Sequence, residues 1–255
     1  MENRELWLAD AVVELAEAAE ADRSEADCAR CLTARLSQLL APAEVGLLLA
    51  DSSGHLLPVA GTNRMAAILE QQKSHNQGPW AHCYRTGQVV LNEAVSTANA
   101  RWPGFTAAAR DAGFDTISAI SLRHRDNALG VACILAGHER VVTRTELGLA
   151  QVLVTTAAMA IAHLREVCRN VRAAEQLQHA LDSRVLIEQA KGILAARLGS
   201  TPDIAFELLR TYARSVSRRL AEIAAAVVQD ELQAHVLVAV HEESRIRAQS
   251  GRHAR

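Results

Sequence analysis

The sequence is poor in aromatic residues and in long apolar runs, which many nucleic-acid and membrane proteins need. Phe, Trp and Tyr make up only 3% of its 255 residues, which argues against a surface that stacks many bases on aromatic rings. It also lacks a run of about 18 apolar residues, the length that spans a bilayer. The nearest stretch, Leu147–Ile161, is interrupted by Gln151 and two threonines. We therefore expect no membrane span.

An excess of charge of one sign is also missing. Lysine and arginine number 27 against 29 acidic residues, a net charge of −2. Overall charge thus predicts no polyanionic partner, and any such site must be a local patch. Hydrophobic residues make up 49% of the chain, enough to bury a core. The length fits two small domains or one large one.

Cysteine is scarce and odd in number: Cys28, Cys31, Cys83, Cys133 and Cys168. Because Met1–Glu5 is charged and no apolar leader follows, we expect a cytoplasmic, reducing location. The Cys28-x-x-Cys31 spacing suits a redox or metal pair, but no second pair completes a zinc site. We interpret these cysteines as small residues on a helix face, and we expect no metal.

Residues 1–165 alternate helical and strand patterns. Helical spacing covers 6–38 in two pieces, 62–75, 80–86, the end of 98–112, and a long helix from Arg144 that Thr143 caps. Gly87 suits a left-handed helix end. Strands are expected at 45–50, 55–60, 88–91, 116–122 and 129–135. Tight hairpins join the first two and the last two, so the pattern predicts an α+β domain: an antiparallel sheet with flanking helices on one face.

Three segments carry a resemblance to GAF domains: Gly78-Pro-Trp-Ala-His-Cys-Tyr-Arg-Thr-Gly-Gln-Val-Val90, Arg101-Trp-Pro-Gly-Phe105 and Ala112-Gly-Phe114. The resemblance covers roughly 20–165 and implies a sensor domain for a small ligand or a signalling protein. GAF relatives bind cyclic nucleotides or haem, but no residue here specifies either, so no cofactor is identified. Trp80 replaces a small residue of the relatives, and its ring is expected to fill part of the pocket.

Between the domains, residues 166–182 continue the helical pattern without Gly or Pro. Apolar residues recur at 3-4 spacing on an otherwise polar helix: Leu164, Val167, Val171, Ala174, Leu177 and Leu181. Such a stripe predicts a two-stranded coiled coil, and hence a homodimer through residues 164–181. The alternative is a linker helix that packs on its own domain.

Residues 183–232 form three further helical patterns. The first pattern contains Gly192 in its interior and ends at Gly199. A glycine inside a helix implies that another helix approaches closely at Gly192. Thr201-Pro202 opens the second, and Ser217 is expected to cap the third. Arg218 and Arg219 then lie in a first turn where cations oppose the helix dipole, an arrangement that suits a phosphate. With Lys191, Arg210 and Arg214 they make a basic face, although a merely solvated charged face explains the same pattern.

The run from Arg184 through Ile187-Glu-Gln-Ala-Lys-Gly-Ile-Leu194 resembles an ANTAR domain, as do Ala205-Phe206, Leu209-Arg210, Ala213, Arg219-Leu220 and Ala224. The resemblance implies a three-helix module that binds stem-loops in nascent RNA and disrupts a downstream terminator hairpin. Matching positions assign RNA contact to Gln189, Lys191, Gly192, Arg210, Ala213, Arg214 and Arg219. The chain departs from the family at Ser217, often Asn, and at Ala195, commonly Met.

We therefore expect a sensor domain (1–165), a coiled-coil helix (166–182), an ANTAR domain (183–232) and a C-terminal helix extension with a basic tail (233–255), mobile after Ala239. The predicted function is signal-responsive RNA binding that prevents transcription termination. The alternative is a ligand-sensing dimerisation or protein-docking module without RNA binding. No nucleophile–base pair is evident, since His82 and Cys83 are adjacent in sequence, so we expect no enzyme.

Overall fold

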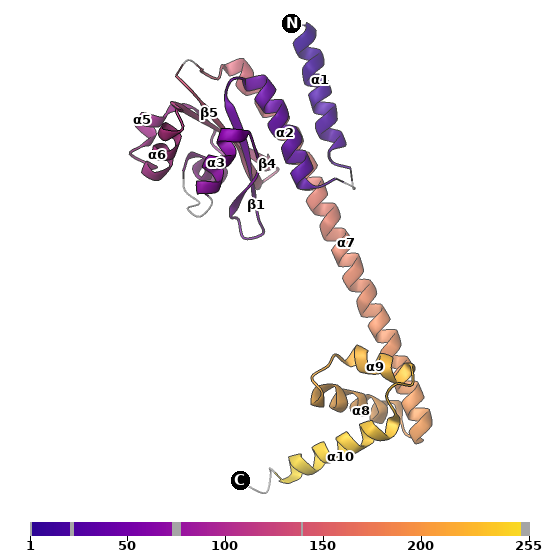
Figure 1. Cartoon of the computed structure of the whole chain (residues 1–255). Helices are drawn as coiled ribbons and strands as arrows, with labels where there is room; N and C mark the ends of the chain where they lie inside the picture. Colours follow the sequence, from indigo (N-terminus) through magenta and orange to yellow (C-terminus); the bar gives the residue numbers. More distant parts are fainter. Residues whose placement is uncertain (1, 21–22, 73–77, 139, 251–255) are drawn as a thin grey trace. The chain divides into compact units, whose positions relative to one another are not determined.

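The computed structural model (Figure 1) describes residues 2–20, 23–72, 78–138 and 140–250. The chain forms two compact units, residues 1–169 and 170–255. One 55-residue helix, α7 (Arg144–Leu198), belongs to both units and runs through their boundary without a break. The predicted helical link between the domains is therefore a single continuous helix.

The first unit is built on a five-stranded antiparallel sheet with the order β2-β1-β5-β4-β3. Its strands are β1 (Glu44–Ala50), β2 (Leu56–Gly61), β3 (Val90–Ala94), β4 (Thr116–His124) and β5 (Asn127–Ala136). Tight turns join β1 to β2 and β4 to β5, so both predicted hairpins are confirmed. The strand expected from residue 88 begins two residues later, at Val90.

Helices cover both faces of this sheet, whereas the sequence pattern predicted one. One layer holds α1 (Glu2–Glu17), α2 (Glu25–Leu40) and the first part of α7 (Figure 1). The other holds α3 (Asn63–Gln72), α4 (Pro79–Thr86), α5 (Val95–Ala98) and α6 (Pro103–Asp111). Strand β1 shows why, because Leu47 and Leu49 join one core cluster while Leu48 joins the other. A strand buried on both sides reads as a continuous apolar run, whereas a strand covered on one side alternates. Residues 45–50 form such a run, so this strand already indicated two covered faces.

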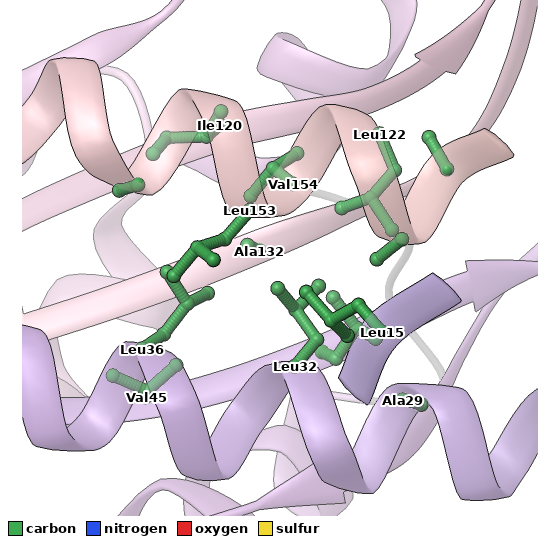
Figure 2. Close-up of a cluster of buried hydrophobic side chains, with 14 of the residues drawn as sticks. Leu15, Ala29, Leu32, Leu36, Val45, Ile120, Leu122, Ala132, Leu153 and Val154 are labelled. Atoms are coloured by element: carbon green, nitrogen blue, oxygen red, sulfur yellow. The ribbon is translucent and has the colours of Figure 1, made fainter. Parts of the chain in front are cut away.

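The α2–α7 side of the sheet contains the larger core, shown in Figure 2. Leu32 and Leu36 of α2 and Leu153 of α7 are fully buried in it. The Cys28 thiol of α2 lies 3.8 Å from the carbonyl oxygen of Ala157 on α7, so these two helices pack side by side. Burying one such leucine contributes about 1.5–3 kcal/mol, and truncating it to alanine costs about 2–5 kcal/mol.

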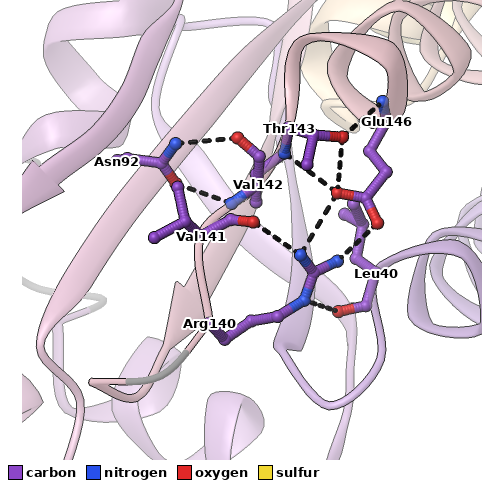
Figure 3. A network of polar contacts seen from close by, with 7 residues as sticks. All are labelled: Leu40, Asn92, Arg140, Val141, Val142, Thr143 and Glu146. Atoms are coloured by element: carbon purple, nitrogen blue, oxygen red, sulfur yellow. Dashed lines mark hydrogen bonds and ion pairs between the residues drawn. The ribbon is translucent and has the colours of Figure 1, made fainter.

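A partly buried polar network fixes the start of α7 (Figure 3). The Arg140 guanidinium donates to both carboxylate oxygens of Glu146, at 3.1 and 2.9 Å, and to the carbonyl oxygen of Leu40 at 3.2 Å. Thr143 and Glu146 cap the helix reciprocally, which confirms the predicted cap. Partial burial raises the pKa of Glu146, but the bonds from Arg140 and Thr143 outweigh it and lower the pKa to about 2.

Helix α7 has a strongly apolar stretch. By length and composition alone, this helix is long and apolar enough to cross a membrane. However, 44% of its most apolar window is buried inside the protein. Ala150, Val154 and Ile161 are 0–2% exposed against the sheet. Packing in the core of the first unit therefore accounts for this composition.

The second unit packs four helices around one small core. They are the last part of α7, α8 (Pro202–Ser215), α9 (Leu220–Val228) and α10 (Ala234–Ser250). The three predicted helices are confirmed, and the Thr201 side chain caps α8 as expected. Helix α10 adds the fully buried Leu237 to the core. The chain after Ala239, predicted to be mobile, stays helical to Ser250, and residues 251–255 lie outside the described part.

Candidate nucleic-acid interface

Lys191 of α7 lies over the ring of Phe206 of α8. The Lys191 Nζ lies 5.6 Å from the centroid of the Phe206 ring, within range of a cation–π interaction. It also donates to both Glu188 carboxylate oxygens, at 3.0 and 2.9 Å. The Lys191 side chain is only 17% exposed, so it lies at the edge of the core rather than on the outer face. The ring beneath Lys191 was not predicted, although Phe206 stands one turn before Arg210.

Helix α8 extends this surface with two arginines. Arg210 and Arg214 follow Phe206 at four-residue intervals, so the three side chains share one face of the helix. Arg210 is 46% exposed and lies 3.5 Å from Glu207. Arg214 is exposed and has no ion pair within the part of the chain that the structure describes.

Ala213 lies on the same helix but does not belong to this surface. It is 5% exposed and packs in the core of the second unit. Its side chain is therefore not available to RNA, and the contact predicted at Ala213 stays a prediction. Its carbonyl oxygen accepts a hydrogen bond from the Arg218 backbone at 3.0 Å, so the residue instead supports the turn that leads to α9.

The turn between α8 and α9 differs from the prediction. Ser217 does not cap α9: its φ is 53°, in the left-handed region, and it ends α8. The N-cap of α9 is Arg219, which makes no side-chain capping bond. Arg218 donates to Glu222 at 3.0 Å. The two arginines thus stand just before the first turn of α9 rather than inside it, and Arg219 is exposed beside free backbone N–H groups.

Gln189 and Gly192 are exposed on α7, on a different side from Lys191. Two residues correspond to about 200° around a helix, so Gln189 and Lys191 point roughly 160° apart. A Cβ added at Gly192 would meet no atom within 4 Å. The expected close approach of another helix at this glycine is therefore wrong for the described residues. Val185 on the same helix is also 55% exposed.

We call Lys191, Arg210, Arg214 and Arg219 the cationic seam. Two of its members, together with neighbouring Arg218, already hold carboxylates, in the pairs Lys191–Glu188, Arg210–Glu207 and Arg218–Glu222. These glutamates are 45–59% exposed, and such surface pairs contribute about 0–1 kcal/mol. A phosphate can therefore replace a carboxylate at little cost. The seam is suited to several phosphates of one polyanion rather than to a single small anion.

In the first unit, Trp80 and the thiols of Cys28, Cys31 and Cys83 lie in the core or against it. Trp80 is 3% exposed, and its ring meets Phe105 edge-on with centroids 4.4 Å apart, so it fills space between the sheet and the α3–α6 layer as expected. Burial raises the pKa of the thiols of Cys28 to about 12 and of Cys31 and Cys83 to about 11, which leaves them poor nucleophiles. No group of three metal-binding side chains occurs among the described residues.

Comparison with known families identifies both units. A family model of GAF domains matches residues 22–162, more than half of the chain. The chain belongs to the GAF domain family. A second family model, of ANTAR domains, matches residues 175–228, from the middle of α7 to the last residue of α9. The GAF domain is thus followed by an ANTAR domain, as the sequence motifs predicted.

Two solved structures are similar to part of this chain, and the first of them supports the fold of the GAF domain. The GAF domain of an Acinetobacter phosphoenolpyruvate-protein phosphotransferase has a TM-score of 0.50 at 13% identity, covering 66% of this chain and 98% of its own. The corresponding domain from Coxiella burnetii has a TM-score of 0.49 at 15% identity, covering 64% and 98%. A search of curated proteins finds no match.

The two families define the general role of each unit. GAF domains are sensor domains and ANTAR domains are RNA-binding regulatory domains; neither is a catalytic family. All four members of the cationic seam, and also Gln189 and Gly192, lie inside the ANTAR match.

Proposed function

We propose that this protein is a cytoplasmic, signal-responsive regulator that binds stem-loops in nascent RNA and so prevents transcription termination. The observation that carries the proposal is the cationic seam: four cations from α7, α8 and the start of α9, within the ANTAR match. The sensor unit carries 15 lysines and arginines against 19 acidic residues, while residues 170–255 carry 12 against 10. Four of those 12 are tail arginines (Arg245, Arg247, Arg252 and Arg255), and the ANTAR match itself carries 7 lysines and arginines against 6 acidic residues. The seam is therefore a local cationic patch rather than a large excess of positive charge.

Phosphate contact is the physical basis of this binding. Each cation that replaces a counterion on RNA adds affinity and makes binding depend on salt. Arginine also forms two parallel hydrogen bonds to a phosphate, which fixes orientation. Gly192 contributes differently, because its bare backbone leaves open space on α7 for a close approach of RNA. Gln189 is an exposed amide on a neighbouring part of the same helix.

A homodimer would multiply these contacts. Residues 168–182 of α7 are all exposed in the single chain. Three of them are large apolar side chains: Val171, Leu177 and Leu181 are 51–68% exposed. We infer that a second copy covers this stripe as a coiled coil. Leu164 is 4% exposed in the core of the first unit, so the free stripe begins at Val167 rather than at residue 164. Two linked RNA-binding units gain avidity without new contacts.

The proposal is tested by transcription through a terminator. RNA crosslinked to the protein in cells is sequenced to find a stem-loop that precedes a terminator, and this template is transcribed in vitro. We expect the wild-type protein to increase read-through and Arg210→Ala with Arg214→Ala to abolish the increase. Arg30→Ala with Arg144→Ala, which removes two exposed cations from the first unit, is the matched control and should act like wild type.

Two results would contradict the proposal. Recovery of no specific RNA would favour the alternative of a ligand-sensing dimerisation or docking module. Equal read-through with the Arg210 and Arg214 variant would show that the seam does not carry the activity.

A further inference from the structure

The first unit contains a groove of about 770 Å³ at one end of its sheet. Ser52 of the β1–β2 turn, Arg125 of the β4–β5 turn, and His163 and Arg169 of α7 contribute to its walls. We call it the hairpin groove. Its lining includes no residue of α3–α6 and not Trp80, so it is separate from the face of the sheet that those helices cover.

The hairpin groove is positively charged within an acidic unit. Three arginines and two histidines line it, with Glu166 as the one carboxylate among its described lining residues. Arg165 is held in place, since it donates to Glu25 at 3.0 and 2.8 Å and to the carbonyl oxygen of Ala50 at 2.9 Å. Arg125 and Arg169 have no ion pair in the described part of the chain. These two guanidinium groups are therefore available to a ligand.

The backbone at Arg125 is strained for an arginine. Its φ is 54°, in the left-handed region that favours glycine, within a two-residue turn between β4 and β5. Holding a non-glycine residue there costs about 1–2 kcal/mol. No hydrogen bond or ion pair of its side chain, within the described residues, offsets this cost. A two-residue hairpin turn favours a positive φ at its first residue, and this turn places Arg125 in the lining of the groove.

The groove also has an apolar part. Leu129, Met159 and Ala162 line it, and Met159 is 53% exposed. A flexible thioether side chain packs well against a planar ring. The volume lies within the range of about 300–1,000 Å³ that is usual for small-molecule sites. The ligand that fits therefore combines negative charge with an apolar, ring-sized portion.

We propose that the hairpin groove binds a small phosphorylated molecule with two or more negative charges and an aromatic base, as in a nucleoside polyphosphate. Arg125 and Arg169 bind the phosphates, and Met159 and Leu129 cover the base. Arg169 lies at the start of the exposed segment of α7 and is the last residue of the first unit, so the ligand is bound by the helix that leaves the sensor unit. The inference deepens the sensor half of the proposed function by naming its ligand class.

Calorimetric titration of the full-length protein with adenosine triphosphate tests this site, with inorganic pyrophosphate and adenosine as partial probes. We expect adenosine triphosphate to bind more tightly than either probe. Arg169→Ala and Arg125→Gly should each weaken it about tenfold, since each removes a charge-assisted contact. Arg125→Gly also relieves the left-handed strain, so its melting temperature should be equal or higher. A loss of binding in that variant is therefore not caused by unfolding.

Two further variants sharpen the test. Glu166→Gln removes the carboxylate from the groove and should strengthen binding about two- to fivefold, opposite in sign to the arginine variants. Arg144→Ala removes an exposed arginine at the start of the same helix, about 38 Å from Arg169. It should leave the affinity unchanged.

The proposal is overturned by no binding of adenosine triphosphate at millimolar concentration, or by equal affinity in the Arg125 and Arg169 variants. Pyrophosphate binding as tightly as adenosine triphosphate would overturn the assignment of a base to Met159. If the two variants weaken stem-loop RNA binding and leave the nucleotide affinity unchanged, the groove belongs to the RNA interface instead. A protein that binds the nucleotide but no RNA would keep this site and remove the proposed function.

Discussion

At the scale of single residues, substitution of Gly192 is expected to change the stability of the fold and the affinity for RNA in opposite directions. It lies in the interior of α7, and a Cβ there would meet no described atom within 4 Å. Gly192→Ala should therefore raise the free energy of unfolding by about 1 kcal/mol through helix propensity. The added methyl group occupies the space proposed for RNA, so the affinity for a stem-loop should fall. Urea denaturation and a gel shift on the same preparation measure both effects.

Gly148 is the matched control for this prediction. It is also a glycine inside α7 with nothing within 4 Å of an added Cβ, but it lies in the sensor unit. Gly148→Ala should raise stability similarly and leave RNA affinity unchanged. If Gly192→Ala binds RNA as tightly as wild type, the open face of α7 is not part of the interface.

At the scale of elements, the network at the start of α7 predicts how stability depends on pH. The folded-state pKa of Glu146 is about 2, against 4.5 for a free glutamate. A lowered pKa stabilises the fold above pH 4.5, and this contribution is lost as the pH falls from 4.5 to 2. The difference corresponds to about 3 kcal/mol. Glu146→Gln should reduce stability at pH 7 and flatten the acid limb of a denaturation series, and an unchanged acid limb would contradict this account.

The exposed stripe of α7 predicts a dimer that two substitutions disrupt. Val171→Glu with Leu177→Glu places like charges on the stripe, so light scattering should report a monomer. Gln176→Glu with Ala180→Glu adds the same two carboxylates on the opposite side of the helix and should leave a dimer. A dimer that persists in the Val171 and Leu177 variant would show that the contact lies elsewhere.

The elements themselves were largely predictable from sequence, because local chemistry determines them. Thr143, Gly87 and Thr201 cap or end helices through contacts with neighbouring residues, and each acts as predicted. Ser217 was misassigned because the same residue type can cap one helix or, in a left-handed conformation, end the previous one. Only the packing of α8 decides which of these two roles Ser217 takes.

The candidate site was less predictable, since it depends on contacts between elements. The placement of Lys191 over Phe206 needs the packing of α7 against α8, and the burial of Ala213 needs the whole core of the second unit. The hairpin groove joins residues 52, 125 and 169, which no local motif connects. Helical spacing nevertheless placed Arg210 and Arg214 one turn apart on α8 before the fold was known.

At the scale of the whole molecule, the central claim is that the cationic seam binds RNA phosphates. The most direct test is the affinity of the full-length protein for a stem-loop RNA over a series of salt concentrations. The logarithm of affinity should fall linearly with the logarithm of salt, with a slope of about −0.7 to −0.9 per phosphate contacted. Lys191→Ala with Arg219→Ala removes two proposed phosphate contacts from the seam. For this variant the account predicts weaker binding and a slope shallower by about 1.4–1.8. The control, Arg30→Ala with Arg144→Ala, should keep the wild-type slope. Equal slopes for all three proteins would contradict the claim that the seam binds RNA phosphates.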